Sequence, residues 1–137
     1  MTENEVNRFL KSHFFATQKI KALELEKKQL RIDAQGGSIS YEGNYPSSKK
    51  NAVEATLMTL SEKEEKIDNE ISELKKKRDK VRAAIDLLND DDLESVLINR
   101  YITYHTVEEV AEIMHYAPRT IKLKQKQAYE KLCTFLP

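Results

Sequence analysis

The chain has 137 residues, of which 34% are charged and only three are glycine and three proline, a composition typical of a helix-rich protein with a modest core. That length holds one ordinary domain, or a small domain joined to an elongated element. The single cysteine, Cys133, excludes an intramolecular disulfide and a cysteine-based zinc site and favours a reduced, intracellular setting. No apolar run approaches the ~20 residues of a membrane span, and the N-terminal sequence lacks the features of a signal peptide. We therefore expect no membrane partner.

The 23 basic and 23 acidic side chains balance over the whole chain but not along it. Residues 90–112 contain seven acidic residues and only one basic residue, Arg100, which gives a local charge of −6. Residues 115–132 then carry five basic residues against Glu130, a local charge of +4. Because a basic stripe is the usual mark of a nucleic-acid binder, the C-terminal stretch is the part to explain.

Two long segments, residues 3–34 and 50–88, are predicted to be helices, because they are rich in Glu, Lys, Gln and Leu and contain neither Gly nor Pro. All three glycines and Pro46 lie between them, which predicts a loop over residues 35–49. The second helix has an unbroken coiled-coil register with spacings of four and three residues: Val53, Leu57, Leu60, Glu64, Ile67, Ile71, Leu74, Arg78, Val81, Ile85 and Leu88.

A helix with such a stripe needs a partner, because the stripe would otherwise lie in water. The first helix offers a similar strip, broken once by a three-residue step: Val6, Leu10, His13, Thr17, Ile20, then Leu23, Lys27, Leu30 and Ala34. We expect an antiparallel hairpin. Parallel self-association through residues 50–88 is the rival. Both can occur together in a homo-oligomer, with a dimer favoured, whose hairpins pack as a four-helix bundle. Residues 1–88 are thus predicted to form an oligomerisation region.

Residues 89–137 are predicted to form a second domain with helix-turn-helix architecture. Asp90, Asp91 and Asp92 suit the start of a helix that runs to about Tyr104 and buries Leu93, Val96, Leu97, Tyr101 and Tyr104. Thr106 and Glu109 have the spacing of a capping box for a second helix, whose buried face is Val107, Val110, Ala111 and Met114. Pro118 suits the first position of the basic helix. His115 occupies the turn position usually given to glycine, and histidine tolerates positive φ.

The stretch RYITYHTVEEVAEIMHYAPRTIKLKQKQAYEKL resembles the helix-turn-helix of region 4 of the primary-type sigma factors. Arg100, Tyr101, Thr106, Glu109, Val110, Ala111 and residues 128–132 carry the match, whereas Ala117, Pro118, Leu123 and Lys124 depart from it. With its charged double-helix segment included, the chain resembles the small RinA-like and ArpU-like transcriptional regulators of phages and prophages of low-GC Gram-positive bacteria. The resemblance implies an all-α activator of phage late or packaging genes, located in the cytoplasm of a bacterial host.

Seven residues are the predicted contacts to double-stranded DNA. Arg119, Thr120, Lys122 and Leu123 lie on the open side of the first two turns of the basic helix, within reach of base edges in the major groove. Lys124 and Lys126 lie further along and are expected at phosphates, and Thr106 and the amides after it suit a phosphate at a helix start. The alternative is a solvated helix face without function.

Other classes of protein are less well supported. There is no glycine-rich phosphate loop, no His/Cys metal constellation and no nucleophile beside a base, so we expect no enzyme, no cofactor and no bound metal. His13 is expected to be a packed histidine and not a ligand. A small terminase-like DNA-packaging protein is the main alternative function. A third is a sigma-like adaptor whose acidic helices bind RNA polymerase.

Overall fold

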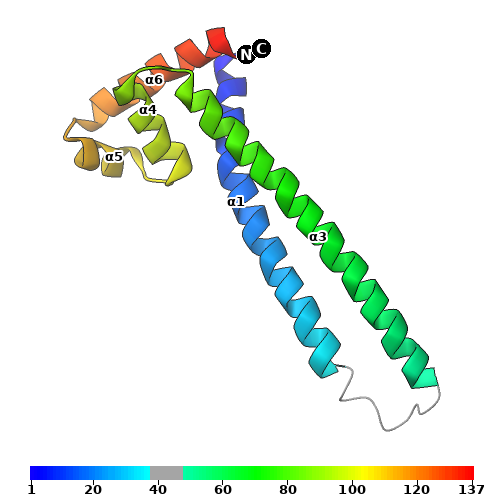
Figure 1. The fold of residues 1–137 in the computed structure, drawn as a ribbon. Coiled ribbons are helices and arrows are strands. Elements are labelled where there is room, and N and C mark those ends of the chain that lie inside the picture. The colour runs from blue at the N-terminus through cyan, green and yellow to red at the C-terminus, as the bar shows by residue number, and fades with distance from the viewer. Residues whose placement is uncertain (38–47) are drawn as a thin grey trace. The chain divides into compact units, whose positions relative to one another are not determined.

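The computed structural model describes residues 1–37 and 48–137, with side chains for residues 1–35 and 60–137. Two long helices come first, α1 (Glu3–Ile32) and α3 (Ser48–Asp86), and α1 continues into a π-helical turn, η1 (Asp33–Gly37). They are followed by α4 (Asp91–Leu97), the π-helical segment η3 (Ile98–Ile102), α5 (Val107–Met114) and α6 (Pro118–Phe135) (Figure 1). The described residues contain no strand, which confirms the predicted all-α class.

By contacts between residues, the chain divides into two compact units. The first joins Met1–Thr17 to Lys75–Pro137, and the second is Gln18–Leu74. The predicted domain boundary between residues 88 and 89 stays a prediction. By their contacts, residues 1–17 and 75–88 belong to the same unit as the C-terminal helices. The predicted loop spans residues 35–49. Residues 38–47 lie outside the described residues, and residues 35–37 and 48–49 are helical.

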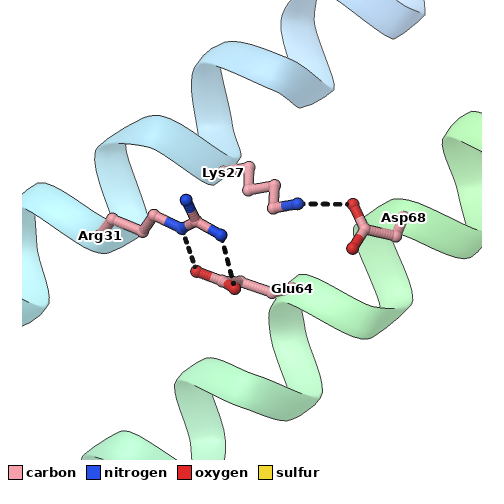
Figure 2. A network of polar contacts seen from close by, with 4 residues as sticks. All are labelled: Lys27, Arg31, Glu64 and Asp68. Atoms are coloured by element: carbon pink, nitrogen blue, oxygen red, sulfur yellow. Dashed lines mark hydrogen bonds and ion pairs between the residues drawn. The ribbon is translucent and has the colours of Figure 1, made fainter.

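In the second unit, α1 and α3 form an antiparallel pair. Lys27 Nζ lies 2.8 Å from Asp68 Oδ1, and Arg31 Nε lies 2.8 Å from Glu64 Oε1 (Figure 2). The residue numbers of the partners in α3 decrease as those in α1 increase, so the two helices run in opposite directions. Along the same strip the buried side chains are Ile20, Leu23 and Ile67, and the half-buried ones are Leu30, Leu60, Ile71 and Leu74.

The predicted hairpin is therefore the pairing present in the described residues. The side chains of Val53 and Leu57, the first two positions of the α3 seam, lie outside the described residues. The two polar seam positions have partners: Glu64 accepts hydrogen bonds from Arg31, and Arg78 donates one to Thr17 Oγ1 at 3.3 Å, within the first unit.

The first unit has a core that joins both ends of the sequence. The residues that make it come from α1, from α3 and the turn after it, from the short α4–η3 segment and from α6: Val6, Leu10, Val81, Ile85, Leu88, Leu93, Leu97, Tyr101, Ala128 and Leu132. The hydroxyls of Tyr101 and Tyr129 contact each other, and both lie within hydrogen-bonding reach of Asn7 Oδ1. The C-terminal helices are thus packed on residues 1–17 and on the last turns of α3, residues 75–86. Sequence periodicity alone gave no sign of this packing.

Candidate nucleic-acid interface

A helix-turn-helix is built from α5 and α6, and its first helix starts at a capping box. Thr106 Oγ1 accepts the backbone N–H of Glu109 at 3.2 Å, and Glu109 Oε1 accepts that of Thr106 at 3.0 Å. The predicted capping box is therefore confirmed. The bond from the Thr106 backbone N–H is also the main reason why the pKa of the Glu109 carboxyl is lowered.

The turn between the two helices is tight because His115 ends α5 in the left-handed region, with φ 59° and ψ 40°. The next backbone N–H, that of Tyr116, bonds back to Ala111 O at 3.0 Å. Ala117 then takes an extended conformation and gives no side-chain cap, and Pro118 begins α6. Both predictions for this turn, positive φ at His115 and proline at the helix start, are confirmed.

The two helices cross over a small apolar cluster. Its buried members are Val96 from α4, Val110 and Ala111 from α5 and Ile121 from α6, with Val107 and Met114 packed at its edge. Ala111 has the small side chain that lets α6 approach α5 closely. Ile121, with Ala128 and Leu132, fixes which side of α6 faces inward.

The opposite side of α6 carries a row that we call the basic face, made of Arg119, Lys122, Leu123 and Lys126. These residues follow at i, i+3, i+4 and i+7, so they share one side of the helix, and all four are exposed. Leu123 has 58% of its surface in contact with solvent. Thr120, the neighbour of Arg119, is half-buried. Four of the seven predicted DNA contacts are thus brought together, with a fifth beside them.

Lys124 lies away from the basic face and has a partner of its own. Its Nζ lies 3.2 Å from Asp92 Oδ2 in α4 and 5.1 Å from the centre of the Tyr116 ring. The Tyr116 hydroxyl donates to the same carboxylate oxygen at 2.8 Å. These bonds, that of Tyr116 first, lower the pKa of Asp92. Lys124 therefore joins α6 to α4 and to the turn, whereas the sequence predicted it at a phosphate.

Thr106, the seventh predicted contact, lies outside α6 and is the N-cap residue of α5. Its hydroxyl and its amide are both used in the capping box. The Glu109 carboxylate holds the Thr106 amide, so a negative charge stands where a phosphate oxygen would have to bind.

A cation that sequence reasoning missed lines the same cleft as Thr106. Lys11 from α1 lines one cleft of about 340 Å³ together with Phe14, Tyr104, Arg100 and Thr106. Arg100 is committed to the fold, since it donates to Gln125 Oε1 at 3.0 Å and to His105 O at 2.9 Å. Lys11 is exposed. Because α1 and Thr106 are far apart in the sequence, no local pattern could have placed this lysine in one cleft with Thr106.

No family model matches the chain, and no match was found among curated proteins or solved structures. Within residues 1–37 and 48–137, no helix combines the length and the apolar character that crossing a membrane needs. The same part of the chain holds no group of three or more His, Cys, Asp and Glu side chains placed to bind a metal ion.

Proposed function

We propose that this protein is a sequence-specific DNA-binding regulator of transcription that reads double-stranded DNA with the basic face of α6. The observation that carries the proposal is the split of α6 into two sides. Ile121, Ala128 and Leu132 are buried, while Arg119, Lys122 and Lys126 are exposed on the other side. No ion pair within the described part of the chain holds any of these three cations.

The arrangement suits the major groove of DNA. In a helix-turn-helix, the second helix lies in the major groove with its N-terminal residues at base edges, while the first helix crosses the DNA backbone. Arg119 lies in the first turn of α6 and has the bidentate donor geometry that guanine O6 and N7 accept. Lys122 and Leu123 follow one turn later, where Leu123 can contact a thymine methyl group. Lys126 lies furthest along and is assigned to a phosphate.

One helix-turn-helix neutralises only a few phosphates, so we infer that the protein binds as a homodimer. Two copies related by a two-fold axis would read half-sites about 34 to 36 Å apart. The resemblance to RinA-like and ArpU-like regulators extends the proposal to phage or prophage late genes, inside a bacterial cell. Lys124 is left out of the proposed DNA contacts because Asp92 and Tyr116 hold it.

The experiment is selection of bound duplexes from a random pool by the purified full chain. We expect the wild type to enrich one motif made of two related half-sites. The triple variant Arg119→Ala/Lys122→Ala/Lys126→Ala should enrich none. The matched control is Lys63→Ala/Lys66→Ala/Lys75→Ala, which removes the same charge from exposed positions of α3. Failure of the wild type to enrich a motif, or equal loss in the control, would contradict the proposal.

A further inference from the structure

The side of α1 that faces away from α3 carries a row of uncharged, exposed residues between positions 18 and 32. We call it the outer stripe: Gln18, Ala22, Leu25, Gln29 and Ile32. The spacings are four, three, four and three residues, which is the periodicity of a coiled-coil seam. All five are exposed, and the large apolar ones, Leu25 and Ile32, have 68% and 50% of their surface in contact with solvent.

Composition does not explain the stripe. Seven of the fifteen residues from 18 to 32 are charged, yet none of them falls on it. Even the strip that packs toward α3 includes a charge, Lys27, whose ammonium pairs with Asp68 (Figure 2). A helix face selected only for contact with water would carry some of these charges. An exposed, uncharged row that includes large apolar residues at seam spacing is typical of a surface that another helix covers.

We propose that the outer stripe is the surface on which a second copy of this chain pairs with the first, as a parallel two-stranded coiled coil. In that register Ala22 and Gln29 take position a, and Gln18, Leu25 and Ile32 take position d. The proposal concerns association of the chain with itself, and it holds whether or not the basic face of α6 binds DNA.

The charges beside the stripe indicate both the partner and its direction. Lys21 and Lys28 precede the a positions, and Glu26 and Asp33 follow the d positions. In a parallel pair each g residue faces the e residue five positions later on the other helix. Lys21 then faces Glu26 of the second copy, and Lys28 faces Asp33 of the second copy. Two-fold symmetry doubles these attractive pairs to four.

An antiparallel pair would lose this match. It brings g residues beside g residues, so that Lys21 would face Lys28 of the second copy, which is a repulsive contact. Within the described residues, Lys21, Glu26 and Lys28 form no ion pair inside their own chain, so their charges are available. Asp33 accepts a hydrogen bond from Gln29 Nε2 at 2.8 Å, which keeps its carboxylate beside the stripe.

The outer stripe also changes where a dimer would form. The sequence predicted association through residues 50–88, but the seam of α3 faces α1 of the same chain in the described residues. The outer stripe supplies a surface for a dimer that leaves the hairpin intact. Since the stripe is only about two heptads long and includes two glutamines, we expect the dimer to be weak.

Sedimentation equilibrium of the full chain without DNA tests the proposal. The wild type should reach a dimer, and Leu25→Glu/Ile32→Glu should raise the dissociation constant on the order of 100-fold or more. The control is Leu87→Glu/Ile113→Glu, at apolar residues with 50% and 49% exposure off the stripe, which should dimerise like the wild type. Circular dichroism should show equal helicity in all three. A wild type that stays monomeric, or a stripe variant that dimerises unchanged, overturns the proposal.

A charge reversal tests the direction without touching an apolar residue. Lys21→Glu places two acidic residues together in a parallel pair and should weaken the dimer on the order of fivefold. Adding Glu26→Lys to the same chain should restore it. In an antiparallel pair, Lys21→Glu would face Lys28 and would tighten the dimer. Tighter association of the single variant, or no rescue by the double variant, overturns the parallel arrangement.

Discussion

The side chains of His13 and Tyr104, 91 positions apart, share a hydrogen bond of 2.6 Å between the imidazole Nδ1 and the phenol oxygen. The Tyr104 hydroxyl also donates to Thr17 Oγ1 at 2.7 Å, and Arg78 donates to the same oxygen at 3.3 Å. Tyr104 has a positive φ of 63° and lies two residues before the cap of α5. This network therefore ties the entry to the helix-turn-helix to α1 and α3.

The Tyr104 hydroxyl is expected to contribute to stability. Tyr104→Phe keeps the ring, which contacts Phe14 edge-on, but leaves His13 and Thr17 short of a hydrogen-bond partner. We expect a loss of about 1 to 3 kcal/mol in the free energy of unfolding, measured by urea denaturation. Tyr116→Phe is a control, because the Tyr116 hydroxyl bonds an exposed carboxylate and should cost less. Equal stability of Tyr104→Phe and wild type would contradict the role given to the network.

His13 makes stability depend on pH. Burial, and then the charge of Arg78, lowers the pKa of His13, although Asp79 opposes the shift. The folded chain therefore keeps the imidazole neutral at a pH where the unfolded chain binds a proton. The contribution of His13 is fully present above the unfolded pKa of about 6.5 and is lost as pH falls from there through the folded pKa.

We therefore expect the urea midpoint to fall between about pH 7.5 and 5.5, a window above the range in which ordinary carboxylates titrate. His13→Gln should reduce that fall, since glutamine does not ionise. The same pH dependence in His13→Gln and in the wild type would show that another group is responsible.

A substitution at the N-cap of α6 should raise the stability of the chain. Ala117 occupies the N-cap position with an extended backbone and gives no side-chain bond. A serine there can accept a backbone N–H of the first turn, so Ala117→Ser should stabilise the chain by about 0.5 to 1 kcal/mol in thermal or urea unfolding. Ala83→Ser, at an exposed position inside α3, should be neutral or slightly destabilising. A loss of stability in Ala117→Ser would mean that the α6 start is not free to take a cap.

The parts of the fold that follow from neighbouring residues were predictable from the sequence. The capping box of Thr106 and Glu109, the Asp90 cap and the left-handed turn at His115 each depend on residues within one helical turn. The α3 seam was predictable for a similar reason, because helical periodicity alone decides which side is apolar. In the described residues those seam positions are buried or half-buried.

Contacts between distant segments were not predictable in the same way. Lys124 was expected at a phosphate because it belongs to a basic stretch, but its partner Asp92 comes from the acidic stretch of another helix. The cleft that Lys11 and Thr106 both line depends on how α1 packs in the first unit. A sequence pattern gives the side of a helix on which a residue lies, but not which distant charge meets it there.

Lys124 and Lys126 should therefore differ in their effect on DNA binding. Lys126→Ala should lower the slope of log affinity against log salt by about one unit on every duplex, because a lost phosphate contact is a lost counterion release. Lys124→Ala should leave that slope nearly unchanged and instead lower the melting temperature slightly, through loss of the bond to Asp92. A larger change of slope for Lys124→Ala than for Lys126→Ala would place the DNA on the other side of α6.

The most direct test of DNA reading by the basic face is a titration of wild type and Arg119→Ala on the selected duplex and on random duplexes. If Arg119 contacts a guanine, the substitution should cost about 1 to 3 kcal/mol on the selected duplex and relax selection at one base pair. Binding to random DNA should change much less. Equal losses on both kinds of duplex, or no loss on either, would contradict sequence reading by this face of α6.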